Sequence, residues 1–120
     1  MIDPKDLNTK AENTWCPGCP NFMILQAFKE VVVELDNENK IKIENTAIVT
    51  GIGCHAKIFD YVNINSFSGL HGRVLPILLG TKLSNPDLKV VGFGGDGDTF
   101  SEGGSHFLHA CRRNADLTMF

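Results

Sequence analysis

Apolar residues in the first third of the chain recur with the period of a helix. Between residues 22 and 35 they share one face, and they are Ile24, Phe28, Val31, Val32 and Leu35. This spacing predicts an amphipathic helix over 22–35, with Asn21 as its N-cap. The polar stretch DNENK that follows predicts a turn.

Further along, short apolar runs alternate with longer helical patterns. Residues 46–50 (TAIVT) and 89–93 (KVVGF) are apolar and rich in β-branched side chains, as buried strands are. A helix is expected within 72–86. Pro76 is compatible with this helix only in its first turn, and the residues before Pro86 should end it.

The last part of the chain continues this alternation. From Ser105 the pattern is helical, with Phe107, Leu108 and Cys111 on one face and Cys111 interpreted as a small core residue. The end of the chain, ADLTMF, begins a third strand. Residues 56–70 fit neither pattern. The alternating order of helices and strands predicts an α/β domain with a mostly parallel, Rossmann-like sheet.

Length and charge exclude several classes of protein. The chain has 120 residues, which suits one domain, and its net charge is −3. The pair Arg112 and Arg113 is too short for a nucleic-acid patch, and no apolar run reaches the roughly 18 residues of a membrane span. Residues 1–14 form a polar arm without the apolar centre of a signal peptide. A cytoplasmic protein with reduced cysteines is therefore expected.

A glycine-rich loop with two aspartates follows the apolar run at 89–93. Open α/β sheets bind ligands at the carboxyl ends of strands, where glycines let the ligand approach the backbone. A carboxylate there would repel phosphate unless a divalent cation lay between them, and Mg²⁺ is held by carboxylates together with phosphate oxygens. Gly95-Asp96-Gly97 therefore indicates a magnesium–diphosphate site with Asp96 as metal ligand. The alternative is a tight turn with solvated aspartates.

Four cysteines offer a second kind of chemistry. The loop from Cys16 to Cys19 can hold a metal or an iron–sulfur cluster through two thiolates, and Cys54, directly after an apolar run, is a natural third ligand. The candidates for a fourth ligand are His55, His71 and Cys111. A redox dithiol and inert thiols are the alternatives, although the polar residues before the loop do not resemble the strand that enters a thioredoxin motif.

Histidines mark two further positions. His71, followed by Gly72 and Arg73, opens the helix expected within 72–86, where it can face a phosphate or act as an ordinary cap. A second set shares one helical face at metal-site spacing, and it consists of Glu102, His106 and His109. A partly buried helix surface is the better explanation of that set.

Taken together, TWCPGC, TGIGCHAK, LHGRVLPILLGTKLSNPDLKVVGFGGDGD and HFLHACRRNADLT resemble one family closely. From about Trp15 onward the chain is similar to the thiamine-diphosphate-binding β subunit of 2-oxoacid:ferredoxin oxidoreductases for 2-oxoglutarate, pyruvate and related acids. The resemblance implies thiamine diphosphate, Mg²⁺ and a [4Fe–4S] cluster as cofactors. It implies oxidative decarboxylation of a 2-oxoacid to acyl-CoA and CO₂, with electrons passed to ferredoxin. It also implies an α subunit as partner.

The resemblance assigns roles residue by residue. Asp96 matches the Mg²⁺ ligand of the family, and Cys16, Cys19 and Cys54 match three ligands of its cluster. Contacts to the cofactor are implied for Ile52, Gly53, Cys54, His55, His71, Gly95, Gly97 and Asp98. No residue of the chain is expected to act as a general acid or base.

Two parts of the family's pattern are not found in these 120 residues. The asparagine that closes the Gly-Asp-Gly motif and the fourth cluster cysteine both lie further downstream in the family. The resemblance therefore implies that residues 15–120 are the N-terminal part of a thiamine-diphosphate-binding domain. The rival hypothesis is a small non-catalytic module that binds zinc or an iron–sulfur cluster through the same cysteines and a histidine.

Overall fold

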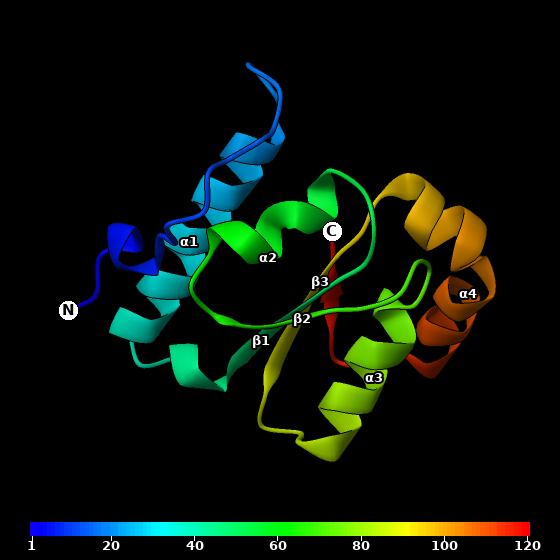
Figure 1. Cartoon of the computed structure of the whole chain (residues 1–120). Helices are drawn as coiled ribbons and strands as arrows, with labels where there is room; N and C mark the ends of the chain where they lie inside the picture. Colours follow the sequence, from blue (N-terminus) through cyan, green and yellow to red (C-terminus); the bar gives the residue numbers. More distant parts are fainter.

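A four-stranded sheet forms the centre of the computed structural model, which describes all 120 residues. The strands follow the order β2-β1-β3-β4, and every neighbouring pair is parallel (Figure 1). Their bounds are β1 Thr46–Thr50, β2 Asn65–Ser68, β3 Lys89–Phe93 and β4 Thr118–Met119. β1 and β3 match the two predicted buried strands residue for residue. The predicted α/β class with a mostly parallel sheet is confirmed.

The two central strands are buried because they have neighbours on both sides. In the register of the sheet, Ile48 of β1 lies opposite Ser66 of β2 and Val91 of β3. Ile48 and Phe93 are fully buried, as the apolar composition of their strands predicts. The edge strand β2 is exposed along its whole length.

Helices cover both faces of the sheet (Figure 1). Their bounds are α1 Asn21–Asn37, α2 Ile58–Tyr61, α3 Val74–Ser84 and α4 Gly104–Arg113. α1 and α2 pack around Ile48 and Phe93 on one face, whereas α3 and α4 pack around Val49 and Val90 on the other. Crossover connections between parallel strands are right-handed. The chain moves from β1 to β2 in one direction and then returns past β1 to β3, so the helices of these two connections lie on opposite faces of the sheet. None of the helices is long and apolar enough to cross a membrane.

The segment that fitted neither sequence pattern contains several short elements. A 3-10 turn, η3 His55–Lys57, leads into α2, and β2 follows after a brief connection. α2 buries Ile58 and Tyr61, whereas β2 buries nothing. Elements of four residues are too short to display a helical or a strand period, which explains the mixed pattern.

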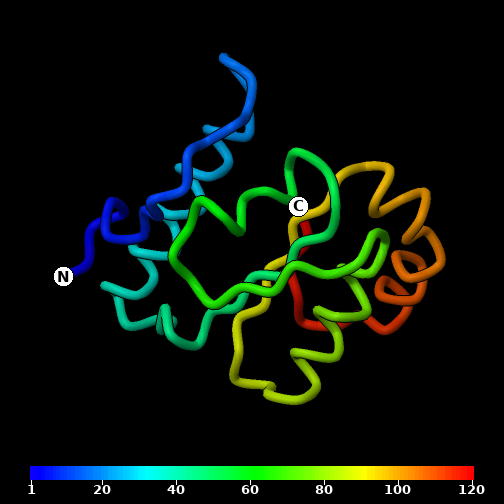
Figure 2. Tube along the Cα trace, viewed as in Figure 1, coloured from blue at the N-terminus to red at the C-terminus, as the bar shows by residue number.

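The N-terminal arm is folded against α1, as the blue trace in Figure 2 shows. Pro4–Leu7 form a 3-10 helix, η1, which begins with a capping box. Leu7 is 5 % exposed and belongs to the core beside α1. The ammonium group of Lys29 in α1, which is also buried, donates a hydrogen bond to Asn8 Oδ1 at 2.8 Å. The polar composition of residues 1–14 did not predict this packing, because a single leucine produces no periodic signal.

Three residues that the sequence pattern placed on the apolar faces of helices lie at the surface. Val31 is 51 % exposed because it borders an apolar groove of about 530 Å³ between α1 and the strands β3 and β4. Cys111, interpreted as a core residue, is exposed, and Leu108 is 68 % exposed. α4 packs Phe107 and Ala110 against the core instead, and this choice of face turns Cys111 outward.

Candidate functional site

The chain reverses its winding direction across the sheet between β1 and β3. From β1 it moves outward to β2, and it then crosses back to β3 on the other side of β1. In open α/β sheets such a switch point leaves a crevice beyond the carboxyl ends of the two strands, and ligands bind there. The loops 51–54 and 94–96, which follow β1 and β3, border this crevice.

These two loops lie close to each other at Gly53 and Gly95. A Cβ atom on Gly53 would lie 3.7 Å from the Cα of Gly95, and one on Gly95 would lie 3.3 Å from the carbonyl oxygen of Ile52. Gly53 has a φ of +124°, a conformation that residues with a side chain rarely adopt. The result is a cradle formed largely by main chain, in which backbone groups can reach a phosphate-bearing ligand. The side chain of Ile52 is 49 % exposed beside it.

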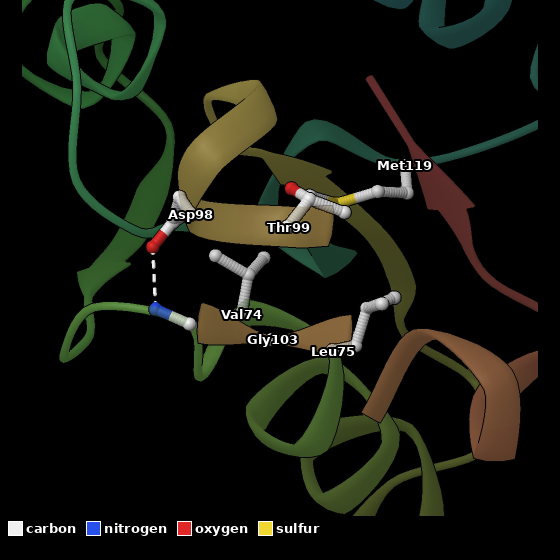
Figure 3. A pocket seen from close by; sticks show the side chains of 7 residues that line it. Val74, Leu75, Asp98, Thr99, Gly103 and Met119 are labelled. Atoms are coloured by element: carbon white, nitrogen blue, oxygen red, sulfur yellow. Dashed lines mark hydrogen bonds between the residues drawn. The ribbon is translucent and has the colours of Figure 1, made fainter. Parts of the chain in front are cut away.

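The two aspartates after this cradle have different surroundings. Asp96 is exposed and directly precedes a short π-helix, η4 Gly97–Glu102, without capping it through its side chain. Asp98 is 2 % exposed, and its Oδ1 accepts a hydrogen bond from the backbone N–H of Gly72 (Figure 3). Of the two carboxylates, that of Asp96 is the one that a metal ion can reach from solvent.

The hydrogen bond from Gly72 joins the loop before α3 to the loop after β3. His71 Nε2 lies 3.9 Å from Asp98 Oδ1, and the His71 side chain is half exposed. Arg73 Nη1 donates to the carbonyl oxygens of Gly72 at 3.2 Å and of Glu102 at 3.3 Å. Segment 71–73 is therefore fixed to both ends of η4, and His71 lies beside the loop that carries Asp96.

Three buried polar atoms close to these contacts have no hydrogen-bond partner, and they are Thr50 Oγ1, Asp98 Oδ2 and Thr99 Oγ1. The space enclosed around Asp98 and Thr99 is too small for a water molecule. Sequence reasoning missed both this cluster and η4, since the helical pattern becomes visible only after Gly103 and Gly104. The available signal was the polar pair Asp98 and Thr99 directly after the Gly-Asp-Gly loop.

Trp15 ties the cysteine loop to the residues that follow β1. Its indole Nε1 donates a hydrogen bond to the carbonyl oxygen of Cys54 at 2.6 Å. Its ring packs edge-on against Tyr61, with the ring centroids 4.9 Å apart. The Tyr61 hydroxyl in turn accepts a hydrogen bond from the backbone N–H of Thr14 at 3.2 Å. These contacts place the start of the cysteine loop against Cys54.

Asn21 and His55 form a second link between the same two segments. Asn21 Oδ1 lies 3.0 Å from His55 Nδ1, and burial lowers the pKa of His55 below its ordinary value. Asn21 was expected to cap α1 but is its first residue, and Pro20 occupies the cap position without a side-chain bond. The Asn21 carboxamide oxygen is engaged by His55 instead of the helix backbone.

The thiols themselves remain separate. Cys16 and Cys54 are exposed and Cys19 is half-buried, all as free cysteines. The structure brings no three His, Cys, Asp or Glu side chains together in an arrangement that could hold a metal ion. This applies to the three cysteines and also to the helical set Glu102, His106 and His109.

Fold and site geometry together define the class of this protein. Residues 51–120, more than half of the chain, match the family model described as thiamine pyrophosphate enzyme, C-terminal TPP binding domain. The chain belongs to this family of thiamine-diphosphate-binding domains. The matched range contains both crevice loops, the His71 loop and η4.

Individual relatives narrow the class to one group of enzymes. The chain is 44 % identical over 104 residues to the 2-oxoglutarate synthase subunit KorB of Archaeoglobus fulgidus, covering 87 % of this chain and 37 % of that protein. It is 45 % identical over 114 residues to the beta subunit of 2-oxoacid:ferredoxin oxidoreductase 2 of Aeropyrum pernix, covering 95 % of this chain and 36 % of that protein. These similarities confirm the resemblance that the motifs indicated.

A solved structure shows the same likeness in three dimensions. The 2-oxoglutarate:ferredoxin oxidoreductase from Magnetococcus marinus, solved with 2-oxoglutarate, coenzyme A and succinyl-CoA bound, has a TM-score of 0.90 at 39 % identity. The match covers 98 % of this chain and 39 % of that chain. The chain therefore spans little more than a third of the length of the relatives it matches.

Proposed function

We propose that this chain provides the thiamine-diphosphate-binding part of the β subunit of a 2-oxoacid:ferredoxin oxidoreductase. The enzyme would convert a 2-oxoacid and coenzyme A into acyl-CoA and CO₂ and deliver electrons to ferredoxin. The observation that carries this proposal is the main-chain cradle at the switch point, where Gly53 and Gly95 approach each other beside the exposed Asp96. The similarity to proteins named as β subunits of such enzymes supports it.

Asp96 is the proposed ligand of Mg²⁺, and the loops on either side of the crevice are the proposed diphosphate contacts. An exposed carboxylate at the end of a glycine cradle suits a magnesium–diphosphate pair, because the cation removes the repulsion between carboxylate and phosphate. His71, half exposed beside this loop, would donate a hydrogen bond to the diphosphate. The other proposed contacts are Ile52, Gly53, Cys54, His55, Gly95 and Gly97. Asp98, for which the resemblance also implies a contact, would make it through its main chain, because its side chain is buried. Bound thiamine diphosphate supplies the electron sink for decarboxylation.

Cys16, Cys19 and Cys54 are the proposed cysteine ligands of a [4Fe–4S] cluster. The hydrogen bond from Trp15 to the Cys54 carbonyl supports this assignment, because it holds the two cysteine-bearing segments together. The three thiols do not converge in this structure. The cluster would therefore require movement of the cysteine loop and one further ligand, and no step of the reaction is assigned to these residues.

The remaining assignments follow from the same proposal. An α subunit would be the partner, and ferredoxin would accept the electrons. Residues 15–120 would form part of the thiamine-diphosphate-binding domain, with residues 1–14 as an arm packed against it. We place the enzyme in the cytoplasm, because a reducing compartment keeps cysteine ligands from forming disulfides.

Cofactor binding by the Asp96→Ala variant tests this function. Calorimetric titration with thiamine diphosphate and Mg²⁺ would be performed on the protein in the assembly in which it purifies. We expect Asp96→Ala to abolish magnesium-dependent binding, because the cation would lose its protein carboxylate. The matched control is Asp87→Ala, which removes an exposed aspartate from the turn between α3 and β3. It should leave the affinity unchanged.

Two results would count against the proposal in different ways. Unchanged magnesium-dependent affinity in Asp96→Ala would remove Asp96 from the metal site. Absence of thiamine diphosphate binding by the unmodified assembly would overturn the proposed function itself.

A further inference from the structure

The carboxylate of Asp98 is buried in an unusual setting. Its side chain is 1 % exposed, and His71 Nε2 lies 3.9 Å from its Oδ1. Oδ1 accepts a hydrogen bond from the backbone N–H of Gly72, but Oδ2 has no hydrogen-bond partner, and the enclosed space beside it is too small for a water molecule. A buried carboxylate with so few partners costs folding free energy. Residues that lower stability in this way are typically found at functional sites.

The ends of β1 and β3 leave room for this carboxylate and for little else. A Cβ atom on Gly51 would overlap Asp98 Oδ2, and one on Gly94 would lie 2.9 Å from the same oxygen. The Cβ on Gly51 would also lie 2.7 Å from a methyl group of Val74, the first residue of α3. The Asp98 side chain therefore points to the α3 side of the two central strands (Figure 3).

The Asp98 carboxylate fixes the backbone at Gly72 through their hydrogen bond. Gly72 has a φ of +71°, and it connects His71 to the residues that begin α3. The bond to Asp98 fixes the Gly72 amide and therefore the backbone from which the His71 side chain extends. On the other side, Asp98 lies two positions beyond Asp96 in the turn after β3. The buried side chain of Asp98 thus connects the loop that carries His71 to the loop that carries Asp96.

We propose that the side chain of Asp98 is a positioning group that locks the 69–73 loop to the 94–98 segment and does not itself bind the cofactor, so that the contact which the resemblance implies for Asp98 would come from its main chain. The lock holds His71 and Asp96 at a fixed separation, so that both can address one magnesium–diphosphate unit. The role in cofactor binding rests on the proposed function. The lock itself is a property of the cofactor-free protein and can be measured separately.

Hydrogen–deuterium exchange and cofactor titration on the same variants test the lock. Exchange in segments 69–75 and 94–99 is measured on the cofactor-free assembly, and thiamine diphosphate affinity with Mg²⁺ is measured by calorimetry. Asp98→Ala removes the acceptor, Asp98→Asn retains an acceptor oxygen without the charge, and Gly51→Ala displaces the carboxylate while retaining Asp98. Thr99→Val is the control, because it removes a neighbouring buried hydroxyl that has no partner.

The lock predicts a distinct pattern across these variants. Asp98→Ala should accelerate exchange in 69–75 and weaken thiamine diphosphate binding, each by about tenfold or more, as expected when a hydrogen bond to a carboxylate is lost. Gly51→Ala should reproduce both effects. Asp98→Asn should stay within about threefold of the unmodified protein in both measurements, because its carbonyl oxygen still accepts the Gly72 N–H. Thr99→Val should change neither.

Other patterns would overturn the proposal. If Asp98→Ala and Asp98→Asn weaken binding equally while exchange in 69–75 is unchanged, Asp98 contacts the cofactor or its metal directly. If Asp98→Ala does not fold, Gly51→Ala decides, and normal exchange in that variant overturns the lock. If the unmodified assembly binds no thiamine diphosphate but Asp98→Ala still accelerates exchange, the lock is supported and the proposed function fails.

Discussion

Two regions border the same crevice and differ in how completely their contacts are formed. Around Asp98, the end of β1, the loop before α3 and the start of η4 are joined by hydrogen bonds and by backbone packing that leaves no space for a Cβ atom. Around Cys54, two loops are joined through the Trp15 indole, but the thiols of Cys16, Cys19 and Cys54 remain apart.

The difference reflects what holds each region together. The Asp98 region uses hydrogen bonds and packing between parts of one chain, so folding alone can complete it. Thiolates have no attraction for one another, and a metal centre is what brings such ligands together, which couples metal binding to local folding. The first region should therefore be rigid before any cofactor binds, whereas the order of the second should depend on binding of the proposed cluster.

Loss of Cys54, the proposed cluster ligand, should have the largest effect on this contrast. We expect anaerobically purified protein to contain iron and acid-labile sulfide, and Cys54→Ser to lose nearly all of both, because a serine hydroxyl is a poor substitute for a thiolate ligand. Iron and sulfide analysis measures the loss. Cys111→Ser, which changes an exposed cysteine on α4, should retain full content.

The metal itself distinguishes the two hypotheses for the cysteine region. Stoichiometric zinc, lost in Cys54→Ser, would support the small metal-binding module instead of the oxidoreductase subunit. Equal iron content in Cys54→Ser and the unmodified protein would remove Cys54 from the site.

The free energies of unfolding of three glycine-to-alanine variants should show how tightly each of the two regions is packed. Gly72→Ala should lower the free energy of unfolding by about 3 kcal/mol, because Gly72 has a positive φ and its new Cβ would lie 2.6 Å from the carbonyl carbon of Glu102. Gly18, in the cysteine loop, also has a positive φ but nothing within 4 Å of its Cβ position. Gly18→Ala should therefore cost only about 1 kcal/mol.

The third glycine provides the control. Gly80 lies within α3 with open space around its Cβ position, so Gly80→Ala should stabilise the protein by about 0.5–1 kcal/mol. Urea unfolding of the three variants gives the comparison. An equal loss in Gly18→Ala and Gly72→Ala would mean that the cysteine loop is packed as tightly as the Asp98 region.

The sequence predicted features whose cause is local and missed those whose cause is distant. β1 and β3 were predicted to the residue because short apolar, β-branched runs at the centre of a sheet have a clear local signature. The position of Asp96 followed from its place after a strand. The contact between Gly72 and Asp98 could not be predicted, because 26 residues separate the two and no periodic pattern relates them. The same applies to Leu7, whose burial depends on α1.

The smallest expected effect concerns Lys29, which helps to hold the arm that leads into the cysteine loop. Burial lowers the pKa of Lys29 below the ordinary value of 10.5, so the folded state releases the proton before the unfolded state does. Below the lowered pKa both states are charged, and the folded state bears the cost of a buried ammonium. As the pH rises through the lowered pKa toward 10.5, this cost disappears and the folded protein gains stability relative to the unfolded chain.

Lys29→Met, which cannot titrate, should lack this gain. The unfolding free energy of the unmodified protein should therefore rise relative to that of Lys29→Met as the pH increases from neutral toward 10.5, as measured by urea unfolding at each pH. Lys10→Met, at an exposed position on the same arm, should follow the unmodified protein throughout. Parallel pH profiles for Lys29→Met and the unmodified protein would show that the hydrogen bond to Asn8 offsets the cost of burying the charge.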